Sequence, residues 1–288
     1  MDDTRLELTD QNRQLLFSIS PFSNNTFPDF NRFNTFSVML VMEGEGTVVA
    51  DFSEYNFNKS CLICFSLYQA FCIKSKGNLK GVMINFHPDF FCLHQHRHEV
   101  SCNGILFNNI YESPVTDLSP SNRKSILTCI DGMRSEMQQP GIAQSEVLLS
   151  YLKILLINAS GIKIEGRKAD QATIIKEPQH IYTLKEAIEK NFRSYHRPGD
   201  YARLLNTSIT VLNNISKRHF YKNLSDLITE RVITETKREL YLTAKPVKLI
   251  AHEMGFTDEF YFSRYFKKHA GVSPLHFRDA VGFNKGNS

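Results

Sequence analysis

Polar and cationic side chains recur at helical spacing in the stretch Pro246 to Arg278. If the part of this stretch after Gly255 forms a helix, its solvent side holds Glu259, Ser263, Arg264, Lys267 and Lys268. A helix laid in the major groove of DNA carries polar side chains for base edges near its N-terminus and cations for phosphates further along. A helical pair with a basic outer face is also common in soluble proteins, so this stretch alone leaves both interpretations open.

A second copy of the pattern lies upstream. With Leu212 placed over Phe262, the copies are 50 residues apart and their exposed faces correspond. The first presents Thr210, Asn213, Asn214, Lys217 and Arg218, and the second presents Phe260, Ser263, Arg264, Lys267 and Lys268. The chain therefore holds two similar units, which favours the DNA-binding interpretation.

Each unit needs two helices joined by a turn. In the second unit a first apolar face ends at Gly255, and Phe262 and Phe266 open another face four residues apart. Gly255 can adopt the positive φ of such a turn, and Asp258, or Thr257, can cap the new helix. This is a helix-turn-helix pattern.

One continuous helical pattern, from Leu224 to about Thr243, separates the two units. About 20 residues at 1.5 Å each span roughly 30 Å, close to the ~34 Å between successive major grooves on one face of B-DNA. We therefore expect this helix to hold two recognition helices in adjacent grooves.

Length and charge agree with two domains of different character. The chain has 288 residues, 42% hydrophobic and 22% charged, with a net charge of +4, so each domain can bury a core. From His180 to Ser288 there are 18 Lys and Arg against 11 Asp and Glu, whereas residues 1–179 hold 16 against 19. A basic C-terminal half suits a polyanionic partner. The apolar runs are too interrupted to span a bilayer and no signal-peptide core begins the chain, so we expect a cytoplasmic protein.

The first half of the chain has the pattern of short strands. Residues 36–42 and 47–52 flank a glycine-containing turn, which predicts a β-hairpin. Further apolar runs at 62–65, 70–74 and 79–86, with no helix between them, favour a sandwich or a small barrel.

From residue 120 onward the pattern becomes helical. Residues 121–139 and 145–157 each predict a helix, the second ending toward Gly161. The second helix is apolar on nearly every side, so it either buries part of its surface against a second subunit or is the inner helix of its own domain. Residues 161–179 are charged, weakly periodic and closed by Pro178, which predicts an interdomain linker.

Histidines and cysteines gather in one segment as His94, His96, His98, Cys92 and Cys102. In an extended strand the three histidines would share a face and could hold a metal with one of the cysteines. The surrounding Gln, Arg and Glu residues are typical of a solvated turn, so exposed or hydrogen-bonded histidines are the alternative. Cys61 and Cys64 have C-x-x-C spacing but lie in an apolar run, which favours packed thiols.

Three segments resemble the DNA-binding domain of AraC/XylS-type transcription regulators. They are YARLLNTSITVLN, LSDLITERVITETKREL and KLIAHEMGFTDEFYFSRYFKKHAGVSPLHFR. More weakly, VMEGEG, CLICFSLYQAF and INFHPDFF resemble the cupin-like N-terminal domain of many such regulators. The resemblance implies an α+β multidomain protein. A cupin-like β-barrel with two flanking helices would occupy residues 1–160 and sense a ligand or dimerise. The linker 161–179 would lead to an all-α DNA-binding domain at 180–282 with two helix-turn-helix units joined by a long helix.

The resemblance also implies roles for single residues. Base edges would be read by Thr210, Asn213, Asn214, Glu259, Phe260, Tyr261, Ser263 and Arg264. Phosphates would be contacted by Lys217, Arg218, Lys267 and Lys268. Asn is suited to adenine, Arg to guanine, Glu to the cytosine amino group and Phe to the thymine methyl group. Tyr261 either reads bases or packs beside the adjacent Phe262.

Three residues depart from the family pattern. Tyr221 stands where glycine is usual after the first recognition helix, and Ser216 stands where an aromatic or aliphatic core residue is usual. We therefore expect the first unit to pack less tightly than the second. Phe260 replaces a small polar residue, so the sequence preference of relatives does not transfer.

The expected partners are double-stranded promoter DNA, a second copy of the chain, RNA polymerase and an unidentified small-molecule effector. The sequence has no phosphate-binding glycine loop, nucleophile elbow or paired-carboxylate motif. The metal histidines usual in the barrel of cupin enzymes are missing from the region around Gly44-Glu45-Gly46. We therefore expect no enzymatic activity and no cofactor. Two rival functions stay open. One is a metal or redox sensor that uses residues 92–102, and the other is a metal-dependent cupin enzyme with an accessory DNA-binding domain.

Overall fold

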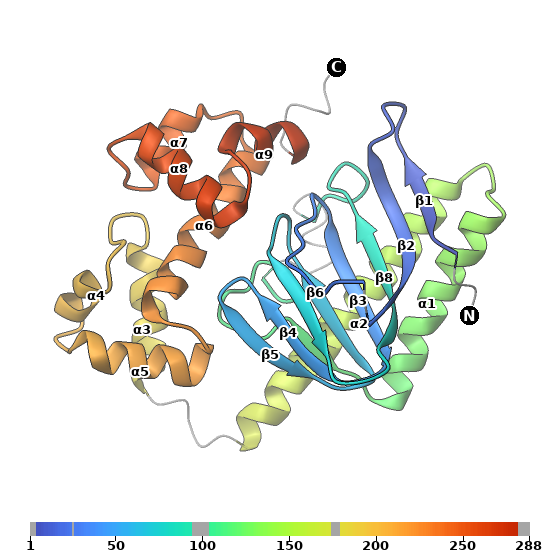
Figure 1. Ribbon diagram of the computed structural model, residues 1–288, viewed down its shortest axis with the longest axis horizontal. Coiled ribbons are helices and arrows are strands. Elements are labelled where there is room, and N and C mark those ends of the chain that lie inside the picture. The colour runs from blue at the N-terminus through green and yellow to red at the C-terminus, as the bar shows by residue number, and fades with distance from the viewer. Residues whose placement is uncertain (1–3, 25, 94–103, 174–178, 282–288) are drawn as a thin grey trace. The chain divides into compact units, whose positions relative to one another are not determined.

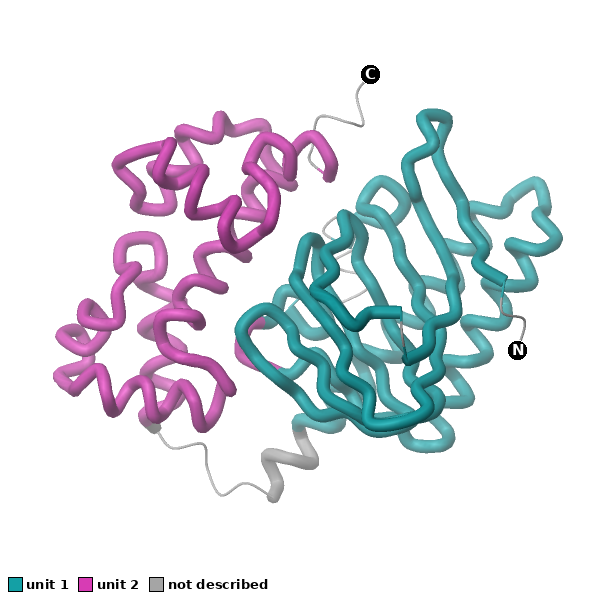
Figure 2. Tube along the Cα trace, viewed as in Figure 1, with its two compact units in different colours: residues 1–109, 113–170 teal, residues 110–112, 171–288 magenta. Residues whose placement is uncertain are grey.

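The computed structural model describes residues 4–24, 26–93, 104–173 and 179–281 (Figure 1). Contacts divide the chain into two compact units (Figure 2). The N-terminal unit comprises residues 1–109 and 113–170, and the C-terminal unit comprises residues 110–112 and 171–288. The expected combination of a β-rich first half and a helical second half is confirmed.

Two antiparallel sheets form the N-terminal unit in the described residues. Their orders are β1-β2-β8-β3-β6-β9 and β5-β4-β7. The strands are β1 (Leu6–Thr9), β2 (Leu15–Ser23), β3 (Phe36–Glu43), β4 (Gly46–Ala50), β5 (Ser53–Phe57), β6 (Cys61–Phe65), β7 (Phe71–Ser75), β8 (Lys80–Phe86) and β9 (Val115–Asp117).

An aromatic-rich core lies between the two sheets. Met39 of β3 and Ile63 of β6 meet Val48 of β4 and Phe71 of β7 there, and the Phe65 and Phe71 rings stack 4.0 Å apart. Every residue of β6 is buried, since the other face of the large sheet is covered as well. Helices α1 (Pro120–Gln138) and α2 (Gln144–Thr173) lie on that side (Figure 1). A closed cupin-like barrel stays a prediction.

The predicted hairpin at 36–52 is wrong. Both strands exist, but β3 pairs with β6 and β8, whereas β4 pairs with β5 and β7. The two glycines of the turn let the chain cross from one sheet to the other. A Cβ added to Gly46 would lie 2.3 Å from the Lys74 carbonyl oxygen, and Gly44 has a φ of +95°.

Helix α2 does not end toward Gly161 but runs through Thr173, so most of the predicted linker is helical. Its extension is anchored because the buried Lys163 ammonium donates to the Ser113 carbonyl oxygen at 2.7 Å. Among the described residues, the segment Gln144–Arg167 is long and apolar enough for a membrane span by length and composition. Core helices of soluble proteins pass the same test, and Leu148, Leu152 and Leu155 are fully buried here.

Helices alone make up the described C-terminal unit. They are α3 (Gln179–Asn191), α4 (Pro198–Leu204), α5 (Ile209–Phe220), α6 (Leu224–Leu242), α7 (Val247–Glu253), α8 (Glu259–Ala270) and α9 (Pro274–Val281). Helix α6 contacts each of the other six and is the centre of the unit. The helix predicted from Leu224 to about Thr243 is therefore confirmed.

Candidate nucleic-acid interface

The helices α5 and α8 begin at matching side-chain caps. Ser208 accepts a hydrogen bond from the Val211 amide at 3.2 Å, and one carboxylate oxygen of Asp258 accepts from the Phe260 and Tyr261 amides at 2.7 and 3.0 Å. These two bonds hold the pKa of Asp258 below its usual value. The cap predicted at Asp258 is confirmed.

The same two helices end alike. The residue after each helix is in the left-handed region, with φ of 59° at Tyr221 and 84° at Gly271. Tyr221 thus has the left-handed conformation that Gly271 has in the second helix-turn-helix unit, although a residue with a side chain is disfavoured in it.

The turns before α5 and α8 differ by one residue. Asn206 has a φ of 48° and lies two positions before the Ser208 cap, whereas Gly255 has a φ of 80° and lies three positions before Asp258. Gly255 also meets its neighbour closely, because an added Cβ would lie 2.0 Å from the Arg193 carbonyl oxygen.

Most of the expected DNA-contacting side chains are exposed. On α5 these are Thr210, Asn214, Lys217 and Arg218, and on α8 they are Phe260, Tyr261, Arg264, Lys267 and Lys268. Thr210, Asn214, Lys217 and Arg218 follow the spacing i, i+4, i+7 and i+8, and Phe260, Arg264, Lys267 and Lys268 repeat it. Each helix thus presents one face with two cations in its last turn.

Three of the expected base-reading residues are only partly exposed, namely Asn213, Glu259 and Ser263. The Asn213 amide oxygen accepts from the Leu224 amide at 3.0 Å, so this side chain satisfies the start of α6. Tyr261 was expected either to read bases or to pack beside Phe262, and its surroundings are compatible with both. Its ring lies 6.0 Å from that of Phe256 and 6.5 Å from that of Tyr265, yet the residue is 53% exposed.

The two helix-turn-helix units are stabilised by different contacts. In the second, the buried Phe266 lies edge-on to Phe277 at 5.8 Å. In the first, the equivalent Ser216 is also fully buried, and its hydroxyl donates to the Lys222 carbonyl oxygen at 2.7 Å. The Lys222 ammonium donates to Glu230 at 2.5 Å and to the Ile110 carbonyl oxygen at 3.0 Å. Polar contacts therefore stand where the second unit has aromatic ones.

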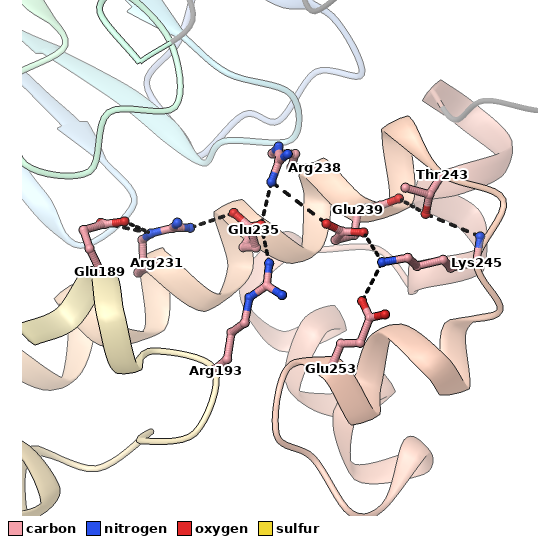
Figure 3. A network of polar contacts seen from close by, with 9 residues as sticks. All are labelled: Glu189, Arg193, Arg231, Glu235, Arg238, Glu239, Thr243, Lys245 and Glu253. Carbon is pink, nitrogen blue, oxygen red and sulfur yellow. Dashed lines mark hydrogen bonds and ion pairs between the residues drawn. The ribbon is translucent and has the colours of Figure 1, made fainter.

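Charged side chains tie α6 to its neighbours (Figure 3). Glu235, which is 5% exposed, accepts from Arg193 at 2.8 Å, Arg231 at 3.0 Å and Arg238 at 2.6 Å. Burial would raise the pKa of Glu235, but the arginines outweigh it and hold that pKa below its usual value. Arg231 also bonds Glu189 of α3 at 2.9 Å.

A second ionic contact lies at the other end of α6. Lys245 donates to Glu239 of α6 at 3.0 Å and to Glu253 of α7 at 2.7 Å, and these bonds raise the pKa of Lys245. Sequence analysis missed both sets of contacts. For the first set, the spacing of Arg231, Glu235 and Arg238, three and four residues apart on a helix, could have predicted ion pairs.

The candidate metal residues His94, His96, His98 and Cys102 lie outside the described residues, and Cys92 is partly buried. Within the described ranges no three His, Cys, Asp or Glu side chains are grouped to hold a metal. Cys61 and Cys64 are buried, and burial raises the pKa of each thiol to about 12, so their prediction as packed thiols is confirmed.

Comparison with known proteins identifies the same part of the chain, the part that contains α5 and α8. Residues 201–280 match the family model described as a helix-turn-helix domain. The raffinose operon transcriptional regulatory protein RafR of Pediococcus pentosaceus is 27% identical over 115 residues, 40% of this chain and 42% of that protein. The Msm operon regulatory protein of Streptococcus mutans is 29% identical over 108 residues, 36% of this chain and 38% of that protein. The chain thus matches about two-fifths of the length of these curated relatives.

Among solved structures, ToxT from Vibrio cholerae O395 matches at 15% identity with a TM-score of 0.39, covering 92% of this chain and 98% of that chain. The C-terminal domain of AraT from Geobacillus stearothermophilus is 24% identical with a TM-score of 0.37, covering 40% and 95%. Taken with the paired caps and helices above, the family match at residues 201–280 shows that this chain carries a helix-turn-helix domain.

Proposed function

We propose that this protein is a sequence-specific DNA-binding transcription regulator of the AraC/XylS type. The observation that carries the proposal is the repeated exposed face of α5 and α8, with Lys217 and Arg218 on one helix and Lys267 and Lys268 on the other. Both curated relatives are named as operon regulators, which supports it.

In this proposal α5 and α8 enter adjacent major grooves. The residues near the start of each helix read base edges, and the four cations contact phosphates. The exposed Phe260 suits a thymine methyl group and Arg264 suits guanine. Asn213 reads a base only if its amide nitrogen faces the groove while its oxygen keeps the bond to Leu224.

The N-terminal unit would supply control. We propose that residues 1–160 form a cupin-like domain that binds a small-molecule effector and dimerises, and that residues 161–179, helical as far as Thr173, connect it to a DNA-binding domain at 180–282. The regulator would act in the cytoplasm on double-stranded promoter DNA and contact RNA polymerase there.

Binding sites can be selected from random duplexes with the full-length protein, and affinity then measured by mobility shift at several salt concentrations. Lys267→Gln should weaken binding and lower the salt slope by about one. Lys190→Gln on α3, where the exposed lysine pairs with Glu186, is the matched control and should change neither. Failure of the wild-type protein to bind any duplex at low salt would refute the proposal.

A further inference from the structure

A pocket of about 620 Å³ lies in the N-terminal unit, at one end of the six-stranded sheet. The ends of β2, β3 and β8 and helix α1 form its walls. Its volume is within the range of small-molecule sites, about 300–1,000 Å³. The chemistry of its lining decides which ligand fits.

Arg134 is the side chain that sets this chemistry. Helix α1 turns Ile126, Ile130 and Met133 inward, and Arg134 lies on the same buried side and lines the pocket. The residue is only 9% exposed. Among the described residues its guanidinium has no hydrogen bond or ion pair, and Asp131, one turn earlier, is exposed and does not reach it. The guanidinium borders the pocket with no protein partner among the described residues, so an anion in the pocket could pair with it.

The rim adds one further cation and one carboxylate. Lys80 of β8 and Glu43 of β3 are cross-strand partners whose side chains are 60% and 59% exposed and 3.9 Å apart. With Arg134 they leave the lining with one net positive charge. A register shift between Val41 and Glu43 places Met42 as an extra residue at the pocket wall, as bulges beside binding sites do.

We propose that this pocket binds a small organic anion. Its carboxylate or phosphate group would meet the Arg134 guanidinium, whose fork of donors suits either group, with Lys80 adding attraction from the rim. The body of the ligand would pack on Phe22, Met42 and Val82. In naming the class of effector the inference rests on the proposed function, but anion binding itself requires no DNA.

The test uses the full-length protein and three matched probes, namely benzoate, phenyl phosphate and neutral benzamide. Their effect on the thermal unfolding temperature and their affinity by calorimetry are measured. We expect at least one anion to stabilise the protein and benzamide to have no effect. Stabilisation by benzoate alone assigns a carboxylate ligand, and stabilisation by phenyl phosphate alone assigns a phosphate.

Variants locate the site. Arg134→Met should weaken anion binding by roughly 10- to 100-fold, the value of a charge-assisted hydrogen bond. The same variant without ligand should be at least as stable as the wild type, because no described group pairs with the guanidinium and its removal leaves no partner unsatisfied. Lys80→Gln should weaken binding a few-fold, and Glu43→Gln should strengthen it. Lys124→Gln, an exposed cation on the same helix, is the control.

Three results would overturn the proposal. They are no stabilisation by either anion at millimolar concentration, equal affinity in Arg134→Met and wild type, and a free Arg134→Met protein that unfolds at lower temperature. Since these measurements contain no DNA, a protein that binds the anion but no duplex would refute the regulator and still support the site.

Discussion

Replacing Gly255 with alanine should destabilise the turn between α7 and α8 by roughly 2–5 kcal/mol. Two effects add. The backbone φ of 80° is in the left-handed region, where a side chain costs about 1–2 kcal/mol. The new Cβ would also lie 2.0 Å from the Arg193 carbonyl oxygen, about 1 Å too close, and relieving such a clash typically costs about 1–3 kcal/mol.

Equilibrium urea unfolding of the full-length protein measures the loss, and hydrogen exchange of the α7 and α8 amides locates it. Gly161→Ala is the matched control with the opposite sign. An added Cβ at Gly161 has open space and the residue lies inside α2, so alanine should stabilise by about 0.5–1 kcal/mol. If Gly255→Ala stays within about 0.5 kcal/mol of the wild type, the steric reasoning fails, since that is the size of an ordinary surface change.

Three further predictions concern the same unit. Tyr221→Gly should stabilise by about 0.5–1 kcal/mol, because the residue has a φ of 59° and is 64% exposed; a lower melting temperature would contradict this. Lys222→Met should destabilise by about 3–5 kcal/mol because it removes the ammonium that pairs with the buried Glu230 carboxylate, and adding Glu230→Leu should recover most of the loss in urea unfolding. Burial lowers the pKa of His196 from 6.5, so stability should be full above about pH 6.5 and fall as the pH drops below it toward the folded pKa. His196→Gln should flatten this dependence in urea midpoints, and an unchanged dependence would assign it to another group.

Local signals predicted much of the C-terminal unit. The limits of α5, α6 and α8 follow from helical periodicity, from a cap at Asp258 and from glycine where the backbone turns. Each of these signals lies within a few residues of the feature it specifies. The left-handed residue at Tyr221 was visible only as a departure from the family pattern, because nothing local favours tyrosine there.

Contacts between distant residues could not be predicted. The strands at 36–43 and 46–50 were identified, but pairing depends on partners elsewhere in the chain, so the hairpin was wrong. Glu235 meets Arg193 across 42 positions of sequence. The sequence shows that Arg134 falls eight residues after Ile126 on an apolar helix face. That this arginine lines a pocket is known only once β3 and β8 are in place beside it.

The central position of α6 restricts how this protein can evolve. In the proposed regulator, the side chains that read DNA are surface residues of α5 and α8, so sequence preference can change by single substitutions that leave the packing intact. The distance and angle between α5 and α8 are instead set by α6, which contacts every other described helix of the C-terminal unit. One residue inserted between Arg231 and Glu235 would turn everything beyond it by about 100° and move these two paired side chains onto different faces of the helix. Single substitutions can therefore adapt the protein to DNA sites of a different sequence, but not to DNA sites with a different spacing between the two contacted grooves.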